Sequence, residues 1–350
     1  MGSYTFPDKG IVFTVGSDPE VFAIDSKGQV IPAFKWLPSQ TSRANKLAPF
    51  WDGFQAEYNV LPYTCHQNLQ HALRTGLQET YQAIKKYDKT ATLTYDSVLP
   101  ISPKLMESVS DTEAALGCSP SINIYPDVEQ LFIPDGRELP IRFAGFHVHH
   151  GLTQYGLSGK KEIENRVRMM DRMGSVILTS LLEGLEDPRR RMFYGRAGEH
   201  RLPAHGLEYR VPPSAALVHP VVTIIALDVL RQAGNFASKG LLEAWKCEGD
   251  TQTQHIINTS DVEQARSVMK DNKDTIKSFI KVNYDDKGYN PDANQSVEKL
   301  IYQGAKSLLP TNLVENWALT DDVTWTGYDH KIGKMVTPTL KYGMHLRLNI

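Results

Sequence analysis

Cysteine is scarce in this sequence, with three residues in a chain of 350. Cys65, Cys118 and Cys247 lie far apart, and they show neither the spacing of a metal site nor the density of a secreted disulfide scaffold. No base is identifiable beside Cys118, so we interpret this residue as a buried structural thiol and not as a nucleophile. A reducing compartment suits this pattern, and we expect a cytoplasmic protein.

The sequence also lacks a long apolar run, a basic leader and a strong net charge. No stretch approaches about 18 consecutive apolar residues, so we expect no membrane segment. The first ten residues hold no basic region followed by an apolar one, and we therefore expect no targeting signal. The formal net charge of -2 removes the electrostatic reason to expect bulk nucleic-acid binding.

What remains is an ordinary globular composition with an α+β pattern. Alternating apolar residues predict strands at 11–15, 21–24, 29–33, 52–60, 91–99, 142–151, 206–212 and 344–350. Helical spacing of apolar residues predicts helices at 66–87, 161–184, 221–233, 261–281 and 295–309. The chain becomes more polar from about residue 250. We therefore expect a catalytic core at 1–250 and a helical extension at 251–350, whose last strand returns to the core.

The most informative stretch is 142–151, which reads RFAGFHVHHG. Strand side chains alternate between faces, so His147 and His149 point to one side and share one surface. Gly145 and Gly151 carry no side chain, so a phosphate, a metal ion or a neighbouring strand could come close there. Hydrogen-bonded histidines on a half-buried strand explain the pattern equally well when it is considered alone.

Two more predicted strands carry oxygen-bearing side chains in register. Asp18 and Glu20 stand two apart, and a shared face would suit a divalent cation. Gln55, Glu57 and Asn59 likewise share one face of a later strand. The first pattern is more commonly explained by a turn followed by a solvated acid. The second is more commonly explained by an ordinary exposed strand face.

Arginines gather around an acid farther along the chain. Glu208 and Arg210 stand two apart in a predicted strand, and Arg196 and Arg201 lie in the loop before it. Guanidinium groups suit phosphate and carboxylate ligands, whereas a surface ion-pair network is the ordinary alternative. Lys46 lies in a polar segment and could meet a phosphate, although loop lysines are usually solvated.

Four separated strands thus each offer functional groups on one face. Acids from different strands, with histidines and arginines, can hold divalent metal ions that bridge nucleotide phosphates, while cations neutralise charge on a transferred phosphoryl group. No Cys/His or Ser/His/Asp arrangement indicates a covalent protein nucleophile. The combination predicts an enzyme of phosphoryl transfer more strongly than any single motif does.

The order and spacing of these motifs resemble the carboxylate-amine ligase superfamily with a glutamine-synthetase-like fold, and within it the phage-type amidoligases of the COOH-NH2 ligase class. The resemblance covers roughly residues 14–235 and rests on GSDPEVF, FQAEYNVLP, LGCSP, RFAGFHVHHG, YGRAG and GLEYRVPPSA. It implies a largely antiparallel β-sheet with helices packed on one side and a glutamine-synthetase-like catalytic core. A phage-encoded enzyme of this kind would act in the cytoplasm of the host cell.

The resemblance also implies roles for individual residues. Its metal ligands would be Glu20, Glu57, His147 and Glu208. Its nucleotide contacts would include His149, to which we add Arg142 and Lys46, and its charge-neutralising catalytic residues would be Arg210, Arg196 and Arg201. Where many relatives have two glutamates on the first strand, this chain has Asp18 and Glu20. Gln55 stands where those relatives often have a second acid, so one metal site would be weaker or absent.

The implied reaction is ATP-dependent and uses Mg2+ or Mn2+. ATP would phosphorylate a small-molecule or peptide carboxylate, and an amine would then attack the acyl phosphate to form an amide or peptide bond. A peptide, a cell-wall fragment, an amino acid and a modified nucleobase all remain open as substrates. The sequence does not set the oligomeric state.

Two other functions are compatible with the same residues. A zinc hydrolase could use His147, His149 and Glu57, but it lacks a third firm nitrogen or sulfur ligand and leaves the arginines unexplained. A virion or scaffold protein could retain the fold without activity. Heat stability separates the three, because ATP with magnesium should stabilise a ligase, zinc alone a hydrolase, and neither a scaffold.

Overall fold

The computed structural model describes residues 13–63, 66–116, 121–125, 135–281 and 297–320, together with two short strands near the C-terminus. The strands are β1 (Thr14–Ile24), β2 (Val30–Ile31), β3 (Phe50–Asp52), β4 (Gln55–Glu57), β5 (Val60–Tyr63), β6 (Thr92–Thr94), β7 (Val98–Pro100), β8 (Ile122–Asn123), β9 (Ile141–Phe143), β10 (Phe146–Gly151), β11 (Glu199–Arg201), β12 (Gly206–Tyr209), β13 (Tyr328–Asp329) and β14 (Lys334–Met335). The helices are α1 (His66–Tyr87), α2 (Pro103–Glu107), α3 (Asp111–Ala114), α4 (Lys160–Met169), α5 (Val176–Leu181), α6 (Pro220–Ser238), α7 (Asp250–Thr259), α8 (Val262–Asp271), α9 (Lys273–Ile280), α10 (Val297–Gln303) and α11 (Leu313–Asn316).

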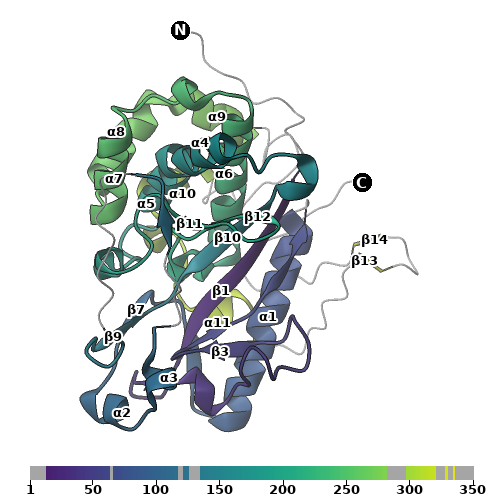
Figure 1. Ribbon diagram of the computed structural model, residues 1–350, viewed down its shortest axis with the longest axis vertical. Coiled ribbons are helices and arrows are strands. Elements are labelled where there is room, and N and C mark those ends of the chain that lie inside the picture. The colour runs from purple at the N-terminus through teal and green to yellow at the C-terminus, as the bar shows by residue number, and fades with distance from the viewer. Residues whose placement is uncertain are drawn as a thin grey trace.

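The strand β1 organises a large antiparallel sheet. It is 11 residues long and pairs with β10, β4, β5, β2 and β6. The sheet continues from β10 through β12 and β11 to β8, and from β4 to β3. Figure 1 shows β1 running through the middle of the molecule, with α4 to α9 gathered at one end and α2 and α3 at the other. The prediction of an α+β chain with a largely antiparallel sheet is confirmed.

The long helices α1 and α6 cover one face of this sheet. The residues of β1 and β10 that point to this face, such as Val15, Val21 and Val148, belong to the same hydrophobic core as Leu73 of α1 and Val222 of α6. The opposite face carries the polar residues of the same strands. Burial of the apolar face therefore determines which side chains remain available for chemistry.

The N-terminal prediction of two short strands is wrong, because β1 is continuous through Pro19. On one side of β1, pairing with β5 ends at Ser17 and pairing with β4 begins at Glu20. A proline has no N–H to donate, so it fits where a strand changes partners. Residues 11 and 12 of the first predicted strand lie outside the described residues.

The single strand predicted at 52–60 is also wrong. Gly53, with φ at +63°, turns the chain between β3 and β4, so that Asp52 pairs with Gln55. Glycine at the first position of a two-residue loop is typical of a β-hairpin, and this turn prevails here over the alternating pattern. The turn returns Asp52 to the neighbourhood of Glu57.

The predicted helices at 66–87 and 221–233 are confirmed as α1 and α6. The helix predicted at 161–184 is interrupted between α4 and α5 by a π-helical turn at Met170–Ser175, which buries Asp171. The helix at 261–281 divides into α8 and α9, and the strand at 91–99 divides into β6 and β7.

The helices after residue 250 pack against the core. Residues of α7 to α10, among them Ile257, Met269 and Leu300, join the same hydrophobic cluster as the sheet and α6. The strand predicted at 344–350 lies outside the described residues, as do Cys65 and Cys118. Within the described part of the chain, no helix combines the length and the hydropathy that a membrane crossing requires.

The packing of α1 on the sheet gives a first prediction. A Cβ at Gly76 would lie 2.1 Å from Cδ2 of Tyr58, whose side chain is fully buried. Gly76→Ala should therefore lower the free energy of unfolding by about 1–3 kcal/mol through overpacking. Alanine otherwise stabilises a helix interior by about 1 kcal/mol relative to glycine. A decrease in stability would therefore indicate the contact with Tyr58, and an increase would indicate that this contact is missing.

Urea unfolding followed by circular dichroism measures this change. Gln82→Ala, at an exposed position of the same helix, is the matched control and should stay within about 0.5 kcal/mol of the parent. A higher urea midpoint for Gly76→Ala would contradict the described packing of α1.

Candidate functional site

The register of the sheet brings the predicted polar strands together. Asp18 pairs with His147, and His149 pairs with Glu208. Glu20 pairs with Glu57 on the other side of β1. Paired residues of an antiparallel sheet point to the same face, so acids and imidazoles from four strands meet on the face that the helices leave uncovered.

A first cluster consists of Asp18, His147 and Glu208. One ligand atom from each lies within 4.8 Å of the others. Nδ1 of His147 is 3.3 Å from Oδ1 of Asp18 and 3.6 Å from Oε1 of Glu208. Both oxygens are buried and accept no hydrogen bond of good geometry from the described residues. An oxygen of this kind is a candidate ligand for a cation.

The two histidines determine the charge state of Asp18. Nε2 of His149 lies 2.9 Å from Oδ1 of Asp18. Burial alone would raise the pKa of Asp18, but the charges of His149 and His147 hold that pKa well below its usual range. The same contact raises the pKa of His149, although burial opposes this change. Asp18 is therefore an anion in contact with both imidazoles.

A second cluster consists of Glu20, Asp52 and Glu57, whose carboxylate oxygens also come within 4.8 Å of one another. Burial and the charge of Glu20 raise the pKa of Asp52 to about 6. Burial, followed by the charges of Asp18, Glu20 and other nearby acids, raises the pKa of Glu57 well above its usual value. Crowded carboxylates resist joint ionisation, and a divalent cation would remove this repulsion.

Both clusters open into one cavity of about 440 Å³. Asp18 and His147 of the first cluster and all three acids of the second cluster line it, and Glu208 lies behind them. Asn59, Arg201, Arg210 and polar side chains of the segment 39–41 form the rest of the polar wall. The aromatic residues Phe50 and Trp51 complete it. The cavity thus joins two groups of possible metal ligands to two guanidinium groups.

The two arginines of this cavity differ in their surroundings. Arg210 is buried, and its Nε lies 3.1 Å from Oε1 of Glu208, while Nη2 donates to the hydroxyl of Tyr194 at 3.2 Å. Tyr194 in turn hydrogen-bonds Nε2 of His147. Arg201 is more exposed, with Nη1 3.6 Å from Glu208 Oε1. Arg210 holds the first cluster in place, and Arg201 lies at the cavity wall.

Gly145 is required for this arrangement. A Cβ at this position would lie 2.7 Å from Nε2 of His147 and 3.0 Å from the hydroxyl of Tyr194. The backbone N–H of Gly145 also donates to Oε2 of Glu20 at 2.6 Å. The glycine therefore admits the His147–Tyr194 pair and links the two clusters.

The structure corrects the interpretation of Arg142 as a nucleotide contact. Arg142 is buried away from the cavity, and its guanidinium donates to the carbonyl oxygens of Leu139, Ala114 and Gly136. It also lies over the ring of Phe54, 4.8 Å from the centroid. These contacts fasten the segments around β9, so the role of Arg142 is structural.

Two other predicted contacts also lie outside the cavity wall. Lys46 is exposed on the segment before β3, and Arg196 is half-buried in the segment before β11. Neither lines the cavity. Both residues lie in segments without regular structure, and sequence proximity to the strands does not determine the direction of their side chains.

The sequence prediction missed Asp52, Tyr194 and His205. Asp52 reaches the second cluster because of the turn at Gly53, which the glycine within the alternating pattern could have indicated. Nε2 of His205 lies 2.9 Å from Nδ1 of His149, and no sequence pattern signals this contact. Tyr194 approaches His147 across 47 positions of sequence, which only the fold can supply.

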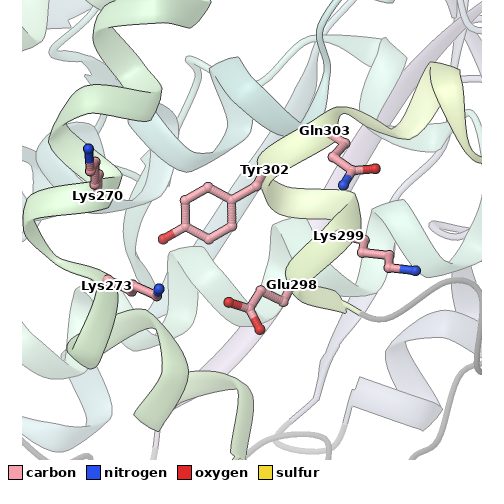
Figure 2. Close-up of a pocket in the computed structure, with 6 residues that line it drawn as sticks. All are labelled: Lys270, Lys273, Glu298, Lys299, Tyr302 and Gln303. Carbon is pink, nitrogen blue, oxygen red and sulfur yellow. The ribbon is translucent and has the colours of Figure 1, made fainter.

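A separate cavity of about 410 Å³ lies between α8, α9 and α10. Figure 2 shows Lys270 and Lys273 on one side of it, while Lys299 points away from them. Its walls also include Glu298, Tyr302 and Gln303. The lysine ammonium groups do not converge on one point of this cavity.

Comparison with known proteins points to ligases. Residues 143–287 match the model of a family described as phage phiEco32-like COOH.NH2 ligase-type 2. The matched part contains His147, Glu208 and Arg210, but it begins after the strands that carry Glu20 and Glu57. No curated protein matches the chain.

Among solved structures, a bifunctional glutathione synthetase from Pasteurella multocida is similar to 86% of this chain, with a TM-score of 0.47 and 10% sequence identity. The chain spans about half the length of that protein, since the likeness covers 48% of it.

The crowding of the second cluster predicts a pH effect. Asp52 has a pKa of about 6 when folded and an ordinary value of 3.8. The raised pKa of Asp52 means that the folded state binds this proton more tightly than the unfolded state does. The stabilisation that the bound proton provides is therefore lost as the pH rises from about 4 to 6. Asp52→Asn stays neutral and should exceed the parent in stability above pH 6, by on the order of 1 kcal/mol or more.

Urea unfolding at several pH values in EDTA measures the difference between the two proteins. The gain should shrink as the pH falls from about 6 toward 4. Glu107→Gln, which neutralises an exposed carboxylate on α2, is the control and should show no such change. A constant gain for Asp52→Asn at every pH would show that Asp52 is not crowded by other acids.

Proposed function

We propose that this chain is an ATP-dependent carboxylate-amine ligase with a glutamine-synthetase-like core. The observation that carries the proposal is one cavity that joins two clusters of possible metal ligands to Arg201 and Arg210. The match of residues 143–287 to a COOH.NH2 ligase family supports it. Phosphoryl transfer requires this combination, because charge on the transferring group must be held by several cations at once.

The residues fit divalent cations. The first cluster offers Asp18, His147 and Glu208, and a nitrogen ligand favours Mn2+ over Mg2+ there. The second cluster offers only oxygens, from Glu20, Asp52 and Glu57, as Mg2+ prefers. The bound cations would supply positive charge next to the phosphates of ATP. The predictions for Glu20, Glu57, His147 and Glu208 are retained in this proposal, with Asp18 and Asp52 added.

The proposed chemistry forms an amide in two steps. A carboxylate oxygen of the substrate attacks the γ-phosphorus of ATP, and ADP leaves with the electron pair of the broken P–O bond. An amine then attacks the carbonyl carbon of the acyl phosphate, and phosphate leaves. Arg201 and Arg210 hold phosphate oxygens, and Tyr194 and Glu208 orient the guanidinium of Arg210.

A zinc hydrolase is less well supported. Each group of possible metal ligands among the described residues contains at most one histidine. His149 contacts Asp18 and His205, so it does not join His147 and Glu57 in a three-ligand site. Two arginines beside an acidic cavity are also of no evident use to a hydrolase.

Nucleotide binding tests the proposal directly. ATP with Mg2+ should raise the melting temperature of the parent, because a ligand at a hundredfold excess over its Kd stabilises the folded state by about 2.7 kcal/mol. Glu57→Gln and Glu208→Gln keep the side-chain shape but remove a charge, and each should lose most of this shift. Glu107→Gln, on the exposed face of α2, should keep it.

Differential scanning calorimetry gives the result in one series. Stabilisation of the parent by zinc alone would indicate a hydrolase, and stabilisation by neither ligand would indicate a scaffold. Equal shifts in the parent and both cluster variants would place the nucleotide elsewhere.

The reaction makes a further prediction for Arg210. Its guanidinium is shared among Glu208, Tyr194 and Ser121, the last at 2.9 Å from Nη1. Lysine cannot make these contacts together, so Arg210→Lys should slow ATP cleavage by roughly tenfold or more, which corresponds to about 1.4 kcal/mol. Rapid-quench analysis of ATP with a pool of metabolite carboxylates and amines measures ADP formation.

Arg189→Lys is the matched control, because Arg189 is exposed and pairs with Asp187 outside the cavity. Its rate should equal that of the parent. A rate within twofold of the parent for Arg210→Lys would remove Arg210 from the catalytic residues. Release of AMP and pyrophosphate would exclude an acyl phosphate.

A further inference from the structure

The ring of Tyr194 is held by two guanidinium groups. Tyr194 is buried, and Cζ of Arg190 lies over its ring, 4.6 Å from the centroid. Cζ of Arg210 lies over the same ring at 5.0 Å. Arg190 is itself fastened, because it donates to the carbonyl oxygens of Val211 at 2.9 Å and Pro212 at 3.1 Å. Cations over an aromatic ring are attracted to it, so these contacts fix the ring independently of its hydroxyl.

The hydroxyl of Tyr194 contacts two groups of the candidate site. It hydrogen-bonds Nε2 of His147, and the two rings meet edge to face with centroids 5.7 Å apart. It also accepts from Nη2 of Arg210 at 3.2 Å. Arg210 has further contacts with Glu208 and Ser121, whereas within the described part of the chain Nε2 of His147 hydrogen-bonds Tyr194 alone. Loss of the hydroxyl would therefore affect His147 more than Arg210.

The other ring nitrogen of His147 faces the first cluster. Nδ1 lies 3.3 Å from Oδ1 of Asp18 and 3.6 Å from Oε1 of Glu208. A neutral imidazole carries its proton on one nitrogen and a lone pair on the other, and only the lone pair can bind a cation. A proton on Nε2 therefore leaves the lone pair of Nδ1 for a cation that Asp18 and Glu208 also bind.

The backbone of His147 is already fixed by the sheet. His147 pairs with Asp18, and the hydroxyl of Ser17 donates to its carbonyl oxygen at 2.7 Å. Rotation about the side-chain bonds is the freedom that remains to the imidazole. The contact between Nε2 and Tyr194 limits this rotation.

We propose that Tyr194 is a positioning residue for metal binding: its hydroxyl oxygen accepts the N–H of Nε2 of His147 and thereby presents Nδ1 to the cation of the first cluster. The inference rests on the cations of the proposed function and adds a residue that is not one of their ligands. Tyr194 does not line the cavity, so it acts through His147. Loss of such an acceptor behind a histidine ligand typically lowers metal affinity by about 10–100-fold.

The hydroxyl of Tyr194 would also determine which cation the first cluster prefers. A nitrogen ligand favours Mn2+ over Mg2+, whereas the second cluster offers only carboxylate oxygens. If His147 turns away, the first cluster retains Asp18 and Glu208 as its ligands. Its affinity for Mn2+ should then fall, while that of the second cluster should not change. The second cluster is thus an internal control within the same chain.

Electron paramagnetic resonance of Mn2+ tests this role on the full chain without ATP. The signal of free Mn2+ during a titration gives the Kd of each cluster. Electron spin echo envelope modulation, recorded with less Mn2+ than protein, shows whether a nitrogen nucleus is bound directly to the ion. The parent should show this nitrogen modulation. Tyr194→Phe keeps the ring, and it should raise the Kd of one site about tenfold or more and lose the modulation.

Two further variants calibrate the measurement. Tyr87→Phe removes the same hydroxyl from an exposed residue of α1 and should leave both Kd values and the nitrogen modulation unchanged. His147→Gln removes the imidazole and defines the spectrum of a site without a nitrogen ligand. Circular dichroism compares the fold of each variant with that of the parent.

Two results for Tyr194→Phe would overturn the positioning role. One is a nitrogen modulation like that of the parent, with both Kd values within twofold. The other is an equal loss of affinity at both clusters, with or without loss of the fold, because Tyr194 would then support the whole site and not His147 in particular.

The shift in melting temperature with ATP and Mg2+ separates this inference from the ligase function. A parent that shows the shift but no nitrogen modulation would refute the roles of His147 and Tyr194 alone. A parent that shows the modulation but no shift would refute the ligase function and support the positioning role.

Discussion

The structure depends on the antiparallel register between β1 and β10. This pairing places Thr14, Gly16 and Asp18 opposite Gly151, His149 and His147. The intervening residues of both strands are buried under the helices. A slip of one residue would turn every charged side chain into the core and every apolar one outward. Burial of the apolar face therefore fixes the positions of the polar side chains on the other face.

The second consequence of this register is concentrated negative charge. Acids from β1, β3, β4 and β12 meet in one partly enclosed space, and burial raises the pKa of both Asp52 and Glu57. A stable protein keeps such a group only when a cation or a proton compensates it. Arg210 compensates Glu208 through a direct contact, and the divalent ions of the proposed function would compensate the remaining charge.

The strand β12, which carries Glu208 and ends just before Arg210, is also supported on its other face. Tyr209 points into the core, where its hydroxyl donates to Asp171 at 2.5 Å and hydrogen-bonds Ser175 at 2.6 Å. Tyr125 donates to the same carboxylate at 2.8 Å. The π-helical turn between α4 and α5 places Asp171 there, and burial raises its pKa to about 7. This network links the helical layer to the face of the sheet that carries the candidate site.

The sequence by itself determined the local features, because alternation and helical periodicity act over a few neighbouring residues. His147 and His149 share a face of their strand, Asp18 and Glu20 share a face of theirs, and α1 and α6 occupy their predicted positions. Only the tertiary structure decided which faces meet. In the fold, the turn at Gly53 brings Asp52 near Glu57, and His205 contacts His149. Arg142 is buried, and its guanidinium donates hydrogen bonds to carbonyl oxygens. These contacts depend on pairing between distant segments, and no local pattern records the register of such a pairing.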